Sequence, residues 1–328
     1  MGKARVYPQQ TFLVENLMGD VSDEFDVEFK GAVDGRTFLG REVEHDPESG
    51  RLVVRVKAQI AKALKKHDLE DLKPLHLPIQ PDARYVEHVG DAVRKDEYLS
   101  AVGSLIFIAT TRPDVQFAVG IASRFSSCPG HEHWALVTRI FAYLSVTRNV
   151  GLSVGLDRSD GSGLLAYVDA DHAGNVGSRR STTGVAVFLD GTLISSTSKR
   201  QATVALSTFV AELNAVAKGV TDLEWYESIL RTLPIGSDTP IRVHCDNKSS
   251  VDALLSPTFV ETRKANDIKV KYVREQVERG FVDLKWINGA DNVADLLTKA
   301  LPAKVAKAHG ETIGLVGFPV GKSAWGSR

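Results

Sequence analysis

The sequence predicts an α/β protein in which a mixed five-stranded sheet flanked by helices follows a smaller, mostly helical α+β region. A polar, glycine-rich break at residues 157–163 separates a helix-rich first part from a second part that opens with strands. The second part has the element order β-β-β-α-β-α-α-β-α, and a right-handed crossover after its third strand would lay the fourth strand parallel to the first. With 328 residues, 43% of them hydrophobic, the chain is long enough for two domains. We place them at residues 1–157 and 158–310, with a tail at 311–328.

In the first region, alternating apolar and acidic residues at 24–29 predict a strand with one wet face. Residues 37–45 and 51–56 flank Asp46-Pro-Glu-Ser-Gly50, whose Pro and Gly supply turn geometry, so a hairpin is expected. The remaining elements of this region are a helix at 57–66, an extended connection at 72–94, and helices at 96–109, 112–125 and 133–146.

The second region opens with a buried strand at 164–168. Asp190-Gly191 lies between two strand-like runs and is a strong signal for a type I′ hairpin turn. A long helix at 206–233 follows, because its apolar residues recur at helical spacing. The later elements are a strand at 241–245, helices at 247–255 and 266–279, a strand at 281–287 and a last helix at 291–299.

Four acids stand at the ends or flanks of these elements: Asp169, Glu212, Asp246 and Asp295. Asp169 and Asp246 would leave the carboxyl ends of neighbouring strands, where open α/β sheets place their ligands. Glu212 lies on the flank of an apolar helical stripe and can reach along the sheet. Asp295 would face water or a cleft, but chain order alone does not choose between it and Asp291.

The convergence of these acids predicts a metal site. Taken singly, each acid is more simply a turn, cap or solvated residue. Two carboxylates about 4 Å apart repel by roughly 4 kcal/mol at an effective dielectric near 20, so four of them together require cations. Magnesium prefers oxygen ligands, and a pair of such ions can activate water and stabilise the leaving oxygen of a phosphodiester. We therefore expect two magnesium ions at this cluster.

Composition limits the other possibilities. The net charge of −1 and pI near 6.8 give no argument from global charge for a nucleic-acid partner, so that claim depends on local features. With two cysteines, no signal peptide and no apolar stretch of membrane-spanning length, we expect a reducing, soluble compartment, cytoplasmic or nuclear, and no membrane partner.

Two alternative site motifs are incomplete. Cys128, His131 and His133 could supply zinc ligands, but the fourth ligand of a structural zinc site is missing. Gly151-Leu-Ser-Val-Gly155 matches the Gly-x-Ser-x-Gly form of a serine hydrolase, but a polar turn stands where the helix after the serine should begin.

A series of short motifs runs in a consistent order from Phe38 to Leu301. They are Phe38-Leu-Gly-Arg-Glu-Val, Ala101-Val-Gly-Ser-Leu-Ile, Thr111-Arg-Pro-Asp-Val, His133-Trp134, Tyr167-Val-Asp-Ala-Asp-His-Ala-Gly, Arg179-Arg-Ser-Thr-Thr-Gly, Ser198-Lys-Arg-Gln, Val204-Ala-Leu-Ser-Thr, Cys245-Asp-Asn-Lys-Ser and Ala294-Asp-Leu-Leu-Thr-Lys. Together they resemble the pol region of copia-type LTR retrotransposons, at the end of the reverse transcriptase and the ribonuclease H domain.

The resemblance implies a ribonuclease H-like domain at 158–310, preceded by a remnant of the thumb-like and connecting parts of a reverse transcriptase. The implied reaction is endonucleolytic hydrolysis of the RNA strand of an RNA–DNA hybrid with two Mg²⁺ or Mn²⁺ ions. The family's catalytic and metal-binding acids fall on Asp169, Glu212, Asp246 and Asp295. The implied partners are the hybrid and the remainder of a reverse transcriptase.

The resemblance also suggests substrate contacts. Asn247, Ser207 and Thr208 adjoin the acids and are either contacts to the groove of the hybrid or helix caps. Arg179 and Arg180 are expected to hold phosphates, as are the neighbouring Lys199 and Arg200.

Two other functions stay open. The chain could be a catalytically silent fragment that only binds nucleic acid or protein, because His172, Val210 and the run at 264–267 differ from the family pattern. It could also cleave duplex DNA or transfer strands, as related acid-cluster nucleases do. No Tyr-x-Asp-Asp turn precedes Thr37, so DNA synthesis by this chain alone is not expected.

Overall fold

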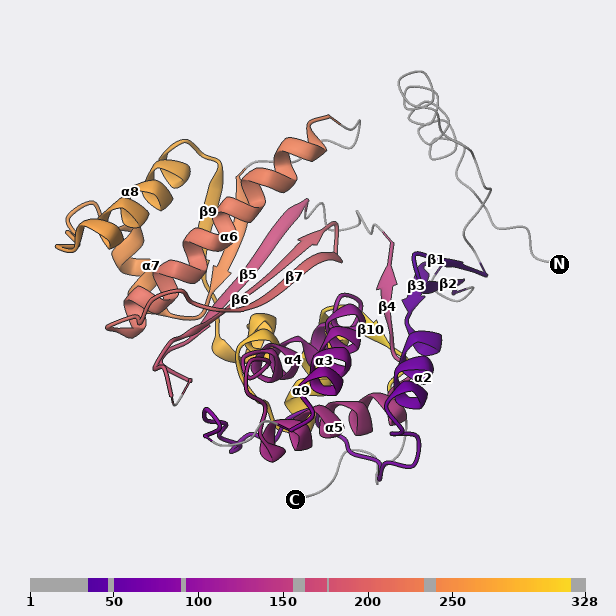
Figure 1. Cartoon of the computed structure of the whole chain (residues 1–328). Coiled ribbons are helices and arrows are strands. Elements are labelled where there is room, and N and C mark those ends of the chain that lie inside the picture. The colour runs from indigo at the N-terminus through magenta and orange to yellow at the C-terminus, as the bar shows by residue number, and fades with distance from the viewer. Residues whose placement is uncertain are drawn as a thin grey trace, which may run out of the picture.

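Two five-stranded sheets, with helices packed on and between them, organise the chain in this computed structural model (Figure 1). The structure describes residues 35–46, 50–89, 93–155, 163–175, 177–232 and 240–319. The strand expected at residues 24–29 lies outside the described residues.

The first sheet is antiparallel throughout and combines segments from both ends of the chain. Its strands, in spatial order, are β1 (Arg36–Phe38), β2 (Arg41–His45), β3 (Leu52–Arg55), β4 (Gly151–Val154) and β10 (Leu315–Val316). The β2–β3 pair is the expected hairpin. Part of the stretch expected as a tail is structured, because residues 311 and 312 end α9 (Ala303–Thr312) and residues 315 and 316 form β10 against β4.

The helices of the first region pack around one hydrophobic core centred on Leu105, Ile140 and Phe141. They are α2 (Lys57–Lys66), α3 (Lys95–Ala109), the 3₁₀ turn η1 (Pro113–Val115), α4 (Gln116–Ser123) and α5 (His131–Val146). Each lies within two residues of an expected helix, except that the helix expected at 112–125 is divided into η1 and the shorter α4.

The second sheet is the mixed five-stranded sheet that the sequence predicts. Its spatial order is β7 (Thr192–Arg200), β6 (Thr182–Leu189), β5 (Leu164–Asp171), β8 (Ile241–Cys245) and β9 (Val282–Trp286). The pairs among β5, β6 and β7 are antiparallel, whereas β8 pairs parallel to both β5 and β9. Positive φ angles at Asp190 (44°) and Gly191 (72°) fit the expected type I′ turn.

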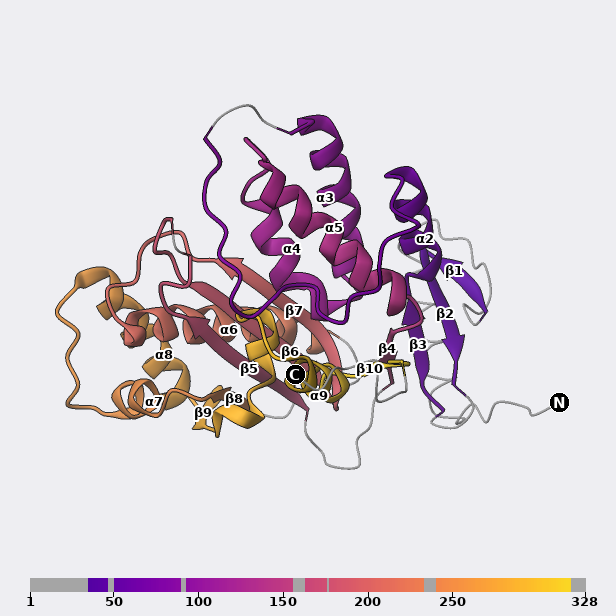
Figure 2. The same cartoon turned by 90° about the horizontal axis from the view of Figure 1, so that it is seen from below.

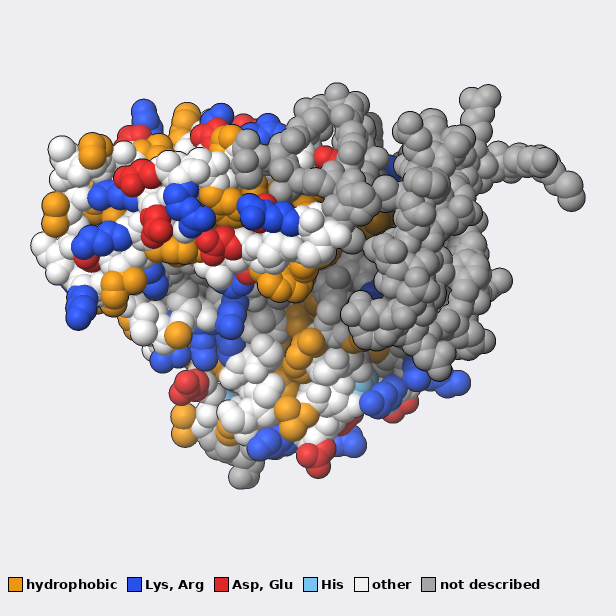
Figure 3. Space-filling model, turned by 90° about the horizontal axis from the view of Figure 1, so that it is seen from above, with side chains coloured by type: hydrophobic (Ala, Val, Ile, Leu, Met, Phe, Trp, Pro, Cys, Tyr) orange, Lys and Arg blue, Asp and Glu red, His pale blue; other side chains and the backbone are white. Residues whose placement is uncertain are grey.

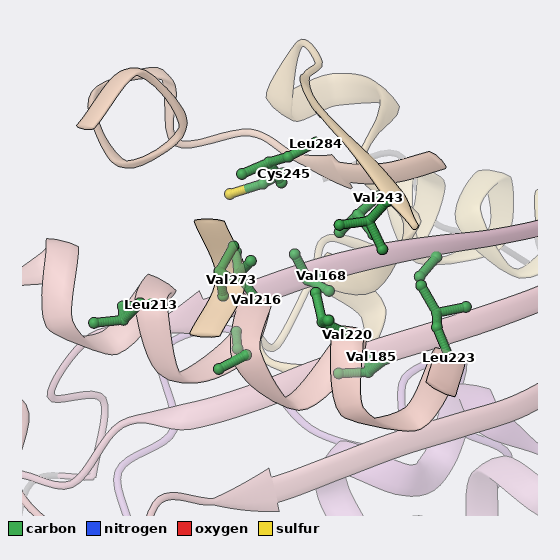
Figure 4. Close-up of a cluster of buried hydrophobic side chains, with 14 of the residues drawn as sticks. Val168, Val185, Leu213, Val216, Val220, Leu223, Val243, Cys245, Val273 and Leu284 are labelled. Carbon is green, nitrogen blue, oxygen red and sulfur yellow. The ribbon is translucent and has the colours of Figure 1, made fainter. Parts of the chain in front are cut away.

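Helix α6 (Thr208–Leu230) lies along one face of this sheet, with α7 (Lys248–Leu255) and α8 (Lys264–Glu278) beside it (Figure 1). Val168, Val216 and Val243 meet in the core between helix and sheet (Figure 4). The close approach requires Gly219, because a Cβ there would lie 2.7 Å from Cγ1 of Val168.

The opposite face of the second sheet is covered by α4 and by the C-terminal segment with α9 (Figure 2). The side-chain amide of Gln116 on α4 donates to Oγ of Ser196 on β7 at 2.7 Å, which joins the two regions directly.

The prediction of a helix at 291–299 is wrong. Two 3₁₀ turns occupy this stretch, η2 (Gly289–Asp291) and η3 (Val293–Leu297), because Asn292 interrupts the helix. Asn292 is buried with extended backbone, and its Nδ2 donates to the carbonyl oxygen of Val168 at 2.9 Å. This bond ties η3 to β5.

The two incomplete motifs serve the fold. Ser153 lies in β4, and its backbone N–H donates to the carbonyl of Gly314, so it is not on a nucleophile turn. His133 stacks on Phe125 at a centroid distance of 3.7 Å, and its Nδ1 accepts from the backbone N–H of Gly130, so this ring is a packed core residue. No helix within the described ranges is long and apolar enough to cross a membrane.

Candidate active site

The parallel pairing of β5 and β8 brings two acids together. Val168 is opposite Cys245 in the register, so Asp169 and Asp246 follow at the same edge of the sheet. Glu212, in the second turn of α6, reaches this edge from the helix side and is only 4% exposed. Carboxylate oxygens of Asp169, Asp246 and Asp295 lie within 4.8 Å of one another. A carboxylate oxygen of Glu212 and the thiol sulfur of Cys245 lie within the same distance of Asp246 and of each other. The predicted convergence of four acids is therefore present.

The structure resolves the choice between Asp291 and Asp295. Asp295 lies in η3, half-buried within the acid cluster, whereas Asp291 is exposed and outside it. The difference follows from Asn292, whose bond to β5 turns the residues after it toward the sheet edge.

A lysine and a threonine, for which the sequence predicted no role, complete the cluster. Nζ of Lys299 lies 2.7 Å from Oδ1 of Asp295 and 3.3 Å from Oδ1 of Asp169. The hydroxyl of Thr298 donates to Oδ2 of Asp169. The four-residue spacing from Asp295 to Lys299 is the signal that could have revealed this ion pair.

Burial and mutual repulsion raise the pKa of every acid in the cluster. The pKa of Glu212 rises to about 9 because of burial first and the charges of Asp169 and Asp246 second. Burial also raises the pKa of Asp169, Asp246 and Asp295, partly offset by Lys299. Burial alone would lower the pKa of Lys299, but Asp169 and Asp295 outweigh it and the pKa is raised. Without a further cation, Glu212 therefore keeps its proton at neutral pH.

A fifth acid, Asp171, lies two residues beyond Asp169 on the same strand, and the period-2 alternation of a strand could have identified it. Its carboxylate folds over Gly174, where a Cβ would fall 1.6 Å from Oδ2 of Asp171. Burial, then Asp169, raises the pKa of Asp171.

An exposed aromatic ring lies at the end of β9, next to Asp246 of the acid cluster. Trp286 is 49% exposed, and its indole N–H donates to the backbone oxygen of Asp246 at 3.0 Å. The ammonium of Lys248 lies 5.9 Å from the ring centroid. A tryptophan at the end of a strand, just before a Gly-containing turn, is the sequence signal that could have placed Trp286 at the site.

The expected substrate contacts fall into two groups. Ser207 caps α6 by accepting from the backbone N–H of Val210 at 3.3 Å, and Asn247 caps α7 by accepting from that of Ser250 at 3.0 Å. The capping alternative is therefore present at both positions.

The other expected contacts are more open. Thr208 is exposed in the first turn of α6. Arg179 is exposed in the turn between β5 and β6, and Arg180 beside it is half-buried.

The donor set fits a hard divalent cation. Carboxylate oxygens from three separate elements converge, and magnesium prefers oxygen ligands with only a few carboxylates in its shell. The raised pKa values of these acids also fit a cation site, since a bound cation would favour the ionised form of each acid.

Sequence comparison finds relatives over most of the chain. It is 32% identical over 312 residues to the retrovirus-related Pol polyprotein from transposon TNT 1-94 of Nicotiana tabacum, covering 92% of this chain and 23% of that protein. It is 32% identical over 308 residues to the Pol polyprotein from transposon RE1 of Arabidopsis thaliana, covering 94% and 21%. The chain thus spans about a fifth to a quarter of these polyproteins.

Among solved structures, the ribonuclease H1 LC11, isolated from compost, aligns with 42% of this chain and 93% of its own, at 19% identity and a TM-score of 0.34. No protein-family model matches the chain.

Proposed function

We propose that this chain, a relative of copia-type retrotransposon Pol polyproteins, carries a ribonuclease H-type nuclease in its second region. The proposed reaction is endonucleolytic hydrolysis of the RNA strand of an RNA–DNA hybrid, leaving a 3′-hydroxyl and a 5′-phosphate. The observation that carries the proposal is the convergence of Asp169, Glu212, Asp246 and Asp295 at one sheet edge.

Different structural contacts position the acids in this proposal. Asp169 and Asp246 are held by the parallel strand pair, and Thr298 fixes the orientation of Asp169. Asp295 is positioned through the anchor of Asn292 on β5. Mg²⁺ or Mn²⁺ bound by these carboxylates would activate water and stabilise the leaving oxygen of the phosphodiester. Glu212, which is buried and has a raised pKa, would ionise when the cation binds.

Recognition of the hybrid belongs to the same proposal. Selecting RNA requires contacts to the 2′-hydroxyl and to the A-like minor groove. Thr208, exposed at the start of α6, is the free hydroxyl nearest to Glu212 in sequence, whereas Ser207 and Asn247 would have to combine groove contact with capping. Arg179 and Arg180 are proposed phosphate contacts. The remainder of a reverse transcriptase is a proposed partner, and a cytoplasmic or nuclear location goes with this role.

The test is a cleavage assay on a labelled RNA–DNA hybrid with Mg²⁺, Mn²⁺ or EDTA. We expect metal-dependent cutting that Asp169→Asn and Asp246→Asn each reduce by roughly 10³-fold or more. Asp291→Asn is the matched control, because this exposed acid lies outside the cluster, and it should cut like the wild type.

Other outcomes distinguish the alternatives. Binding of the hybrid without cutting would identify a silent binding module. Cutting of duplex DNA in preference to the hybrid would identify a different acid-cluster nuclease. Metal-dependent cutting that survives both substitutions would remove the acids from the mechanism.

A further inference from the structure

A hollow lies where the first region meets the second, next to the acid cluster. The first region contributes Arg84, Phe117 and Ile121, and the second contributes Asp171, Arg179 and Lys299. Lys299 also contacts Asp169 and Asp295, so the hollow and the acids share a wall. Any group bound in the hollow would therefore be a close neighbour of the reacting phosphodiester.

The charges that line the hollow favour an anion. Three cations, Arg84, Arg179 and Lys299, stand against one carboxylate, Asp171. Lys299 is occupied by two carboxylates, but neither arginine forms a salt bridge with any residue that the structure describes. The side chain of Arg84 donates only to the adjacent carbonyl of Ala83, at 3.2 Å, among the described hydrogen bonds. Both guanidinium groups are thus available to a ligand.

The face over α6 and α8 differs in charge from the hollow. Over α6 and α8 the surface mixes Lys and Arg with Asp and Glu, rather than forming one basic face (Figure 3). The net charge of −1 gives no general attraction for nucleic acid either. In the hollow, by contrast, Phe117 and Ile121 supply apolar walls, which strengthen electrostatic attraction at short range. A planar guanidinium is also well suited to paired hydrogen bonds with phosphate oxygens.

We propose that this hollow binds a backbone phosphate of the nucleic-acid substrate, held jointly by Arg84 of the first region and Arg179 of the second. The inference rests on the proposed nuclease function and extends it, because it makes the first region part of the substrate site. The strand being cut would then be held at the acids and, beyond Lys299, at this second phosphate.

The test is hybrid binding by the full chain carrying Asp246→Asn, which lies outside the hollow and is expected to leave the hybrid uncut. Fluorescence anisotropy at several salt concentrations gives the affinity and its salt slope. Arg84→Ala should weaken binding by about three- to tenfold and reduce the slope by about 1. Arg84→Lys should recover the slope but not the full affinity, since it keeps the charge and loses the planar fork. Arg179→Ala should behave like Arg84→Ala.

Two further measurements sharpen the result. If both arginines hold one phosphate, the double variant should lose less than the product of the two single losses. Arg94→Ala is the matched control, because Arg94 is a highly exposed arginine of the same region paired with Glu97, and its loss should change neither affinity nor slope. All variants should keep the wild-type unfolding midpoint.

The two proposals fail differently. A wild-type chain that binds the hybrid but never cuts it, while Arg84→Ala weakens binding, overturns the nuclease and retains the phosphate site. A chain that cuts, with Arg84→Ala binding like the parent or Arg94→Ala losing as much, overturns the phosphate site alone. A chain that does not bind the hybrid overturns both.

Discussion

The ammonium of Lys299 lies 3.3 Å from Oδ1 of Asp169, although 130 positions separate the two residues in the chain. The same nitrogen contacts Asp295, four residues earlier in the chain. One lysine thus supplies the positive charge that holds two acids together when no metal is bound.

Replacing Lys299 should therefore destabilise the metal-free protein. We expect Lys299→Met to lower the free energy of unfolding in EDTA by about 1–3 kcal/mol, because the buried Asp169 and the half-buried Asp295 lose their counter-ion. Added Mg²⁺ should restore part of the loss. Lys271→Met is the control, since Lys271 forms an exposed pair of the same spacing with Asp267 at 2.8 Å and should cost about 0.5 kcal/mol or less. Urea unfolding measures both, and equal losses would contradict the counter-ion role.

Glu212 should make the stability of the metal-free protein depend on pH. Its folded-state pKa of about 9 lies above its ordinary value, so the folded protein keeps a proton that the unfolded chain loses. The stability linked to this proton is fully present below the ordinary pKa of the acid and is lost as the pH rises toward 9.

Glu212→Gln keeps a neutral side chain at every pH and removes this dependence. The variant should match the wild type near pH 5 and exceed it at pH 8 by on the order of 2–4 kcal/mol in EDTA, while losing the proposed cutting. Thermal or urea unfolding at the two pH values measures the difference. Glu275→Gln, on the exposed surface of α8, should leave the profile of the wild type unchanged. A pH-independent gain at position 212 would show that burial of the charge is not the cause.

Gly184 on β6, opposite Asp169, leaves space for η3. A Cβ at this position would lie 2.6 Å from Cγ2 of Thr298 and 2.9 Å from the carbonyl oxygen of Ala294. Gly184→Ala should therefore displace the segment that carries Asp295, reduce the proposed cutting by about tenfold or more and destabilise the fold by about 1–3 kcal/mol.

Gly103→Ala provides the comparison for that experiment. Gly103 lies within α3 with no atom inside 4 Å of its would-be Cβ. Gly103→Ala should stabilise the protein by about 0.5–1 kcal/mol. Cleavage rates and unfolding midpoints of the two variants test the prediction, and unchanged cutting by Gly184→Ala would show that η3 can shift without consequence.

Local pattern predicted most of the second sheet. The strand Ile241–Cys245 and the turn at Asp190-Gly191 carry their own signals, in alternating burial and in turn chemistry, and both appear at the expected positions. The crossover rule predicts from the sequence alone that Asp169 lies beside Asp246.

The features that the sequence did not predict depend on contacts between residues far apart in the chain. β4 and β10 have four and two residues, and they are strands only because they pair with each other and with β3. The break at Asn292 likewise reflects its bond to Val168, 124 positions away, which no local propensity encodes. The choice of Asp295 over Asp291 followed from that break.

The pairing of β4 with β10 gives the second sheet two fixed attachments instead of one. The chain leaves the first sheet after β4, builds the acid-bearing fold, and comes back to the adjacent strand. A fold that leaves and returns through neighbouring strands resists rotation about either connection, so the acids and Arg84 should keep a fixed spacing. Truncating the chain at residue 310 would remove one attachment and the outer strand of the first sheet, so the acids would lose that fixed alignment with the first region.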